Sequence, residues 1–339
     1  MKRLLPLLLA AVVIMLAACN TPDSPLLPAQ STATLEASAT PTLTDTPTPI
    51  PGKALLFAGG SADPALSALV SEQAGKAGLT FETRDSLQPA DLGAEVKLVV
   101  AVDAPANLAE LLAAAPQAQF VVASRSGLQA ADNLTVLQMQ PEQQAFTAGL
   151  VATLISDAWR AAGLIPADAP RLQDAFANGG RYYCGVCSPG WPLGVTFPLV
   201  NGAAAPGDGA AWAAVAADFF DNGKAESFYL SAAATKPEVI TYLAGRSQFE
   251  TAVKVVGELP PPDELRAQWA ATVGFDLPGA LAQALPTALS GKSAGTLAVP
   301  ISLSNINPDV FSPGRQEVVR TILSELEQGI IPPLSVPPE

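Results

Sequence analysis

Short apolar runs alternate with helical stretches along this chain from residue 53 onward, and that alternation limits the fold more than any other feature. Strands that alternate with helices of this length are typical of parallel βαβ units, whose sheets are covered on both faces. The first half repeats the pattern as 53–60 "KALLFAGG", a helical stretch over 63–78, 96–103 "VKLVVAVD", 105–116 "PANLAELLAAAP" and 118–126 "AQFVVASRS".

The second half shows the same rhythm, and the region from Lys53 to Glu339 is long enough for about two domains. We therefore predict an α/β protein with two parallel-sheet lobes and a central cleft. Residues 53–157 are expected to form mainly the first lobe and 158–295 mainly the second, while 296–339 supply a crossover strand and a C-terminal helix. The strands expected in the second half are 161–165, 193–200, 225–234, 250–259 and 269–276.

Two helices have clear sequence signals. In "PEQQAFTAGLVATLISDAW", Pro141 and Glu142 suit a first helical turn, and Phe146, Leu150 and Leu154 recur at the four-residue spacing of one buried face. In "SPGRQEVVRTILSELEQG", a serine, a proline and a closing glycine occupy the usual start and stop positions.

The composition excludes several kinds of chemistry, because the chain has three cysteines and no histidine. A Ser/His/Asp triad and a Cys/His pair both need an imidazole base. A zinc site made of four thiolates needs one cysteine more than the chain has. The net charge of −13 opposes nucleic-acid binding, which depends on clustered Lys and Arg. We expect no enzymatic activity, no cofactor, no metal site and no nucleic-acid partner.

The N-terminus predicts export and membrane anchoring. Lys2 and Arg3 precede an apolar run over residues 4–15, which is short for a membrane span. The following Leu-Ala-Ala-Cys, at 16–19, resembles the lipobox of bacterial lipoproteins, and this resemblance implies a lipidated Cys19 after cleavage of the signal peptide. An ordinary secretory signal or a short membrane anchor are the alternatives. The expected location is the extracytoplasmic face of the cell membrane.

Residues 20–52 are rich in Thr, Pro, Ser and Ala and lack apolar periodicity. Such a segment cannot bury enough surface to offset its ordering entropy. We interpret it as a disordered tether that lifts the body from the bilayer.

Several stretches together resemble the basic membrane lipoprotein (BMP) family. They are 119–124, 136–156 with its "PEQQAFTAGL", 217–247 and the ending "NPDVFSPGRQEVVRTILSELEQGIIPP". The resemblance covers most of residues 53–333. It implies a type I periplasmic-binding fold and a nucleoside-receptor role beside an ABC permease. The clamp that binds nucleosides in that family is largely absent, because the loop after the first strand keeps Asp63 without the aromatic residue that follows it.

Ligands of such folds lie outside the carboxyl ends of parallel strands. This rule selects seven ligand-binding candidates, of which Arg125 could hold a carboxylate or phosphate through both arms of its guanidinium. Each could instead be a turn residue or a helix cap. The candidates are Ser61, Asp63, Asp103, Ser124, Arg125, Trp212 and Glu258.

Cys184 and Cys187 lie in "RYYCGVCSPGW", and with Cys19 lipidated they form an even pair in an oxidising compartment. The Ser-Pro-Gly-Trp-Pro that follows opposes a helix starting at Cys184, which a catalytic dithiol would favour. We therefore predict a local disulfide clip. A tethered thiol–disulfide oxidoreductase and a receptor-like envelope interaction or sensor module remain the alternatives to a solute receptor.

Overall fold

The structure is a computed structural model that describes residues 51–59, 63–187, 192–203 and 207–335. The predicted signal peptide, Cys19 and almost all of the predicted tether lie outside these residues, as does Ser61. None of the described helices is both long enough and apolar enough to cross a bilayer.

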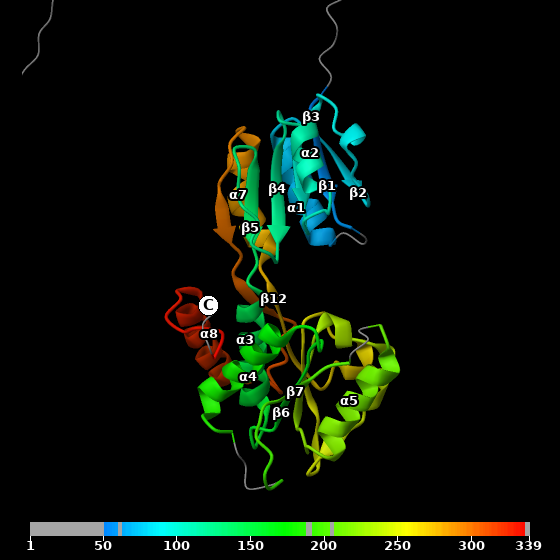
Figure 1. Ribbon diagram of the computed structural model, residues 1–339, viewed down its shortest axis with the longest axis vertical. Helices are drawn as coiled ribbons and strands as arrows, with labels where there is room; N and C mark the ends of the chain where they lie inside the picture. The colour runs from blue at the N-terminus through cyan, green and yellow to red at the C-terminus, as the bar shows by residue number, and fades with distance from the viewer. Residues whose placement is uncertain (1–50, 60–62, 188–191, 204–206, 336–339) are drawn as a thin grey trace, which may run out of the picture. The chain divides into compact units, whose positions relative to one another are not determined.

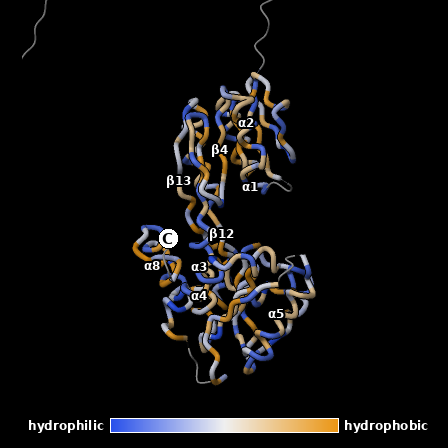
Figure 2. Tube along the Cα trace, viewed as in Figure 1, coloured by the Kyte–Doolittle hydropathy of each residue, from blue (hydrophilic) through white to orange (hydrophobic). Residues whose placement is uncertain are grey.

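The first lobe is built on a six-stranded, all-parallel sheet. Helices α1 (Pro64–Lys76) and α7 (Leu277–Leu289) cover one face, and the short α2 (Leu108–Ala114) covers the other (Figure 1). All six residues of the central strand β4 are buried, and this part of the tube is largely apolar in Figure 2. In spatial order the strands are β13 (Thr296–Ala298), β5 (Leu134–Gln138), β4 (Gln119–Ser124), β3 (Val96–Ala101), β1 (Lys53–Phe57) and β2 (Thr80–Arg84).

The second lobe has its own six-stranded sheet, parallel except for the antiparallel pair β12–β14. Helices α3 (Pro141–Ile155), α4 (Pro170–Cys184) and α8 (Pro313–Glu327) cover one face, and α5 (Gly209–Asp221) and α6 (Pro237–Leu243) cover the other. In spatial order the strands are β14 (Ile301–Ser304), β12 (Trp269–Phe275), β11 (Lys254–Gly257), β8 (Ser227–Leu230), β6 (Ala161–Leu164) and β7 (Leu199–Asn201).

The chain passes from one sheet to the other three times: from β5 into α3, from β12 into α7 and from β13 into β14. The connecting segments are hydrogen-bonded to one another, since Val299 N donates to Gln138 O and Asp276 N donates to Pro300 O, each at 2.9 Å. The three connections are therefore adjacent to one another.

The lobes therefore exchange segments at points other than those expected from the sequence. Helix α3 was expected in the first lobe but packs into the core of the second, and α7 was expected in the second but packs on the first sheet. The apolar pattern of a helix shows that one face is buried but does not show which sheet buries it. Within the predicted strand 193–200, only Leu199 and Val200 are in β7, which extends to Asn201.

Helix α3 is buried on every side, not on one face as its four-residue spacing suggested, because every residue from Gln143 to Ile155 is buried. Two glycines allow α4 to lie directly against it. A Cβ atom on Gly149 would overlap the carbonyl oxygen of Phe176, and a Cβ atom on Gly179 would overlap the carbonyl oxygen of Phe146. The two contacts are reciprocal, so the backbones of α3 and α4 touch at two points.

Replacing Gly149 with Ala should lower the free energy of unfolding by at least about 2 kcal/mol, because the new methyl group meets backbone that cannot rotate away. Gly75→Ala is the matched control. Gly75 lies inside α1 with no atom within 4 Å of its would-be Cβ, so alanine there should be neutral or stabilise by about 0.5–1 kcal/mol. Urea unfolding of both variants measures the difference. Equal stability of the two would contradict the close helix contact.

Candidate ligand-binding site

Polar side chains from both sheets gather where parallel strands end. Asp103 and Arg125 follow β3 and β4 in the first lobe, while Ser231 and Glu258 follow β8 and β11 in the second. They contribute to two neighbouring cavities of about 210 and 260 Å³, which share Arg125, Gln144 and Glu258. A position outside the carboxyl ends of parallel strands is where α/β folds bind small molecules.

The two cavities differ in their other walls. The smaller is also lined by α3 and second-lobe residues: Pro141, Ala145, Ile165, Pro166, Leu172, Tyr229, Ser231, Ala232 and Ala233. The larger adds residues that follow strands of both sheets and the segments that join the lobes: Val102, Asp103, Met139, Leu259, Gly274, Phe275 and Leu277.

An ion pair between Arg125 and Glu258 lies at the boundary shared by the cavities. Arg125 Nη1 is 3.3 Å from Glu258 Oε1, and the guanidinium lies over the ring of Phe275, 5.5 Å from its centroid. The Arg125 side chain is 49% exposed and that of Glu258 only 16%. The second carboxylate oxygen of Glu258 accepts a hydrogen bond from Ala232 N at 2.9 Å, so this carboxylate is fixed to the second lobe.

Tyr229 and Gln144 provide buried polar groups beside this pair. Burial raises the pKa of Tyr229 well above its usual value of 10, the charge of Glu258 raises it further, and Arg125 opposes the rise. The phenol is therefore neutral at physiological pH and can act as a hydrogen-bond donor. Gln144 lies in the first turn of α3, and its Nε2 donates to Val273 O at 2.9 Å, which fixes the side chain at the cavity wall.

Of the seven ligand-binding candidates, the structure brings three together, since Asp103, Arg125 and Glu258 all line the larger cavity. Asp63 instead caps α1, where its carboxylate accepts from Ala65 N at 2.8 Å. Ser124 is buried. Its Oγ donates to Ser126 O and accepts from Ser126 N, across the turn that contains Arg125.

Trp212 was selected as a ligand-binding candidate, but the structure does not place it at either cavity. Its side chain is fully buried in the core between α5, α6 and the second sheet. Its indole belongs to the same apolar cluster as Phe219 and Phe220 of α5.

Four cavity residues were not selected from the sequence, although three of them also lie at the carboxyl ends of strands, where such folds bind ligands. Tyr229 is the second-last residue of β8, Phe275 is the last residue of β12, and Ser231 follows β8 directly. Gln144 lies one turn into the helix that follows the first connection between the lobes. A search that included the last residues of each strand would have found three of these four.

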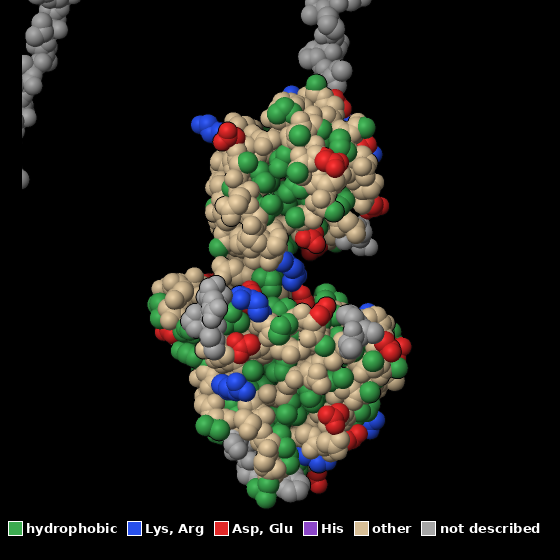
Figure 3. All heavy atoms as spheres, viewed as in Figure 1, with side chains coloured by type: hydrophobic (Ala, Val, Ile, Leu, Met, Phe, Trp, Pro, Cys, Tyr) green, Lys and Arg blue, Asp and Glu red, His purple; other side chains and the backbone are tan. Residues whose placement is uncertain are grey.

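The surface carries few basic groups on the face shown in Figure 3, where Lys and Arg side chains are scattered and several lie beside Asp or Glu. This distribution agrees with the net charge of −13.

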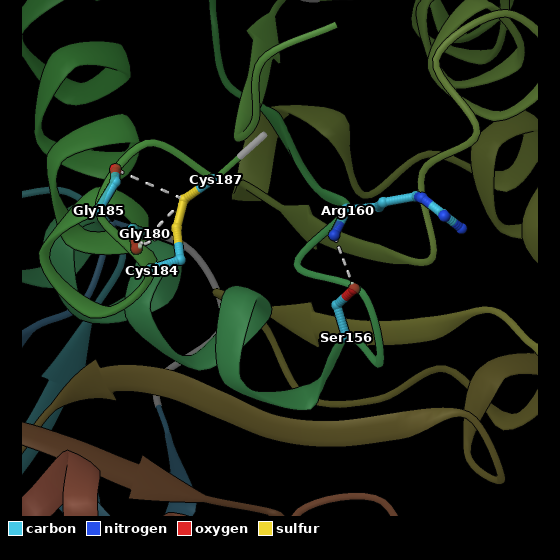
Figure 4. Close-up of a disulfide and its surroundings, with 6 residues drawn as sticks. All are labelled: Ser156, Arg160, Gly180, Cys184, Gly185 and Cys187. Atoms are coloured by element: carbon cyan, nitrogen blue, oxygen red, sulfur yellow. Dashed lines mark hydrogen bonds between the residues drawn. A yellow bond between two sulfur atoms is a disulfide. The ribbon is translucent and has the colours of Figure 1, made fainter. Parts of the chain in front are cut away.

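The cysteine pair lies away from the cavities, at the C-terminal end of α4. Cys184 is the last residue of the helix, and it forms a disulfide with the buried Cys187 (Figure 4). The carbonyl oxygen of Gly180 lies 3.1 Å from Cys184 Sγ and 3.7 Å from Cys187 Sγ. A helix C-terminus and a nearby carbonyl oxygen both disfavour a thiolate. This environment suits a structural clip and does not suit a catalytic dithiol.

Several solved structures have a similar fold. The chain is similar to an ABC transporter solute-binding protein from Conexibacter woesei (TM-score 0.61, 16% identity, 84% of this chain and 98% of that one). A solute-binding protein of an ABC transporter system from Aeropyrum pernix gives a TM-score of 0.53 at 16% identity, over 82% of this chain and 86% of that one. A solute-binding protein from Agrobacterium vitis, bound with α-D-tagatopyranose, gives a TM-score of 0.51 at 10% identity, over 78% of this chain and 98% of that one.

No protein-family model and no curated protein sequence matches the chain. The similar solved structures and the two sheets nevertheless show the fold of the type I periplasmic-binding proteins, with two α/β lobes, as the sequence predicted. At these identities the likeness concerns the fold, and function has to be argued from the site itself.

The clip can be tested on the chain from residue 20 onward, which keeps the compact unit Pro49–Glu339 and contains two cysteines. Thiol titration of the denatured, unreduced protein should find essentially none, and two after reduction. Replacing both cysteines with serine should lower the free energy of unfolding by about 2 kcal/mol, because the closed loop is short. Two titratable thiols before reduction would contradict the clip.

Proposed function

We propose that the protein is an extracytoplasmic solute-binding lipoprotein, anchored through lipid on Cys19, that delivers a small polar solute to an ABC-type permease. The observation that carries this proposal is the pair of cavities at the carboxyl ends of both sheets, with charged side chains from each lobe. A receptor of this kind needs no catalytic group, cofactor or metal.

The cavities favour a compact, uncharged ligand with several hydroxyl groups. Their walls are largely apolar, with a few fixed polar groups in Gln144, Tyr229 and Ser231 and the paired charges of Arg125 and Glu258. Hydroxyl groups can donate to the carboxylate and accept from the guanidinium, while one apolar face of a sugar ring packs against an aromatic ring. The protein from Agrobacterium vitis, which binds a hexose, supports this ligand class.

The relationship to the BMP lipoproteins remains part of the proposal. We infer a divergent member whose ligand is the size of a monosaccharide and not a purine nucleoside. The burial of Trp212 supports this, because its indole is unavailable for stacking on a purine base.

Binding is proposed to act through lobe closure. A ligand that contacts both lobes stabilises the closed form relative to the open form by its differential contacts, and the three connecting segments absorb the rotation. The closed form is then the one presented to the permease.

The soluble chain from residue 20 onward should show a raised melting temperature with at least one member of a panel of pentoses, hexoses, inositols and nucleosides. Arg125→Ala should weaken binding of that compound at least about tenfold, since a charge-assisted hydrogen bond contributes roughly 1.5–3 kcal/mol. Arg320→Ala, which removes an exposed arginine paired within α8, should leave the affinity unchanged.

Native mass spectrometry of the purified protein, read for a retained small molecule, provides an independent measurement. A panel that never changes the melting temperature, together with a ligand-free native mass, would reject the receptor proposal. That result would favour an envelope interaction or sensor module.

A further inference from the structure

Arg125 lies where a small anion would be expected to bind. It directly follows a strand of the first sheet and lines both cavities, and half of its side chain is exposed. The guanidinium carries five N–H donors in a flat fork that matches carboxylate, sulfate and phosphate groups. An arginine in this position, without an internal partner, would make the cavity an anion site.

Glu258 occupies that position on Arg125 from the opposite lobe. The contact is a single one, from Nη1 to Oε1 at 3.3 Å, and so is longer than the roughly 2.7–2.9 Å of a strong charge-assisted hydrogen bond. Such a contact neutralises Arg125 but leaves its fork open to a hydroxyl oxygen. The hydrogen bond from Ala232 N fixes Glu258 independently, so the carboxylate stays in the cavity when Arg125 moves.

Asp103 adds a second carboxylate to the larger cavity. An anionic solute near Arg125 would therefore face two negative charges and would have to displace one of them. A neutral solute can contact both members of the pair and leave their charges balanced, which avoids an unpaired charge at a partly buried site.

We propose that Glu258 is a specificity-determining residue: an internal anion that prevents Arg125 from binding anionic solutes. The consequence for the natural solute rests on the proposed function. The charge preference of the cavity does not, because it can be measured with a simple anion.

The test uses sulfate as the probe and the whole chain from residue 20 onward. Melting temperatures of the wild type and of Glu258→Gln are followed at neutral pH as sulfate replaces an equal ionic strength of chloride. Glutamine keeps an acceptor for Ala232 N but loses the charge. We expect Glu258→Gln to bind sulfate saturably, at least tenfold more tightly than the wild type, and the double variant Arg125→Ala/Glu258→Gln to lose this binding.

Glu317→Gln is the matched control, because it removes one carboxylate from an exposed ion pair on α8. It reports the general effect of sulfate on stability. If Glu258→Gln gains no more sulfate stabilisation than Glu317→Gln, or if the wild type binds sulfate as tightly as Glu258→Gln, the inference is wrong. Glu258→Ala provides a second variant should the glutamine variant fold poorly, and the same gain is expected.

The outcome separates this inference from the receptor proposal. A gain of sulfate binding in a protein that binds no neutral solute would support the role of Glu258 and reject the receptor. A neutral solute that binds equally well with and without the Glu258 charge, with no gain of sulfate binding, would support the receptor and reject the role of Glu258.

Discussion

The contact between α3 and α4 is the packing constraint on which the second lobe depends. Gly149 and Gly179 each place a hydrogen atom where any other residue would place carbon against a carbonyl oxygen of the partner helix. The two helices therefore pack as one unit, and α3 can be buried on all sides, between α4, α8 and the sheet. Because α3 is also the first segment to enter the second lobe, this unit fixes where Pro141 and Gln144 reach the cavity.

The same topology explains why the candidate site contains charges from distant parts of the sequence. Parallel strands present their carboxyl ends at one edge of each sheet, and the three connections between the lobes leave from that edge. Arg125 and Glu258, 133 residues apart, meet there. In a chain with only 14% charged residues, an ion pair between two cavities indicates a functional role more strongly than a pair on an exposed helix would.

The sequence predicted the class of fold, and it selected three of the residues that line the larger cavity, for the same reason. Fully buried strands such as β3 and β4 give unbroken apolar runs, and the residue after each run marks the binding edge, which is how Asp103, Arg125 and Glu258 were found. Helix α4 was not among the predicted elements; it contains Gly179 and Gly180, a residue type that disfavours helices but that close packing requires here. The lobe boundaries and the burial of Trp212 depend on which sheet a helix covers, and local periodicity carries no information on this.

The cysteine pair and the ion pair illustrate how similar residue types acquire different roles from their surroundings. Cys184 and Cys187 lie at the negative end of a helix beside a carbonyl oxygen, where a thiolate would be unfavourable, so the pair that looks most reactive in the sequence is suited to structure. Arg125 looks like an anion receptor in the sequence, but it faces a carboxylate that the second lobe fixes independently. In both cases the partner atoms within about 3.5 Å, and not the motif, set the chemistry that the site can support.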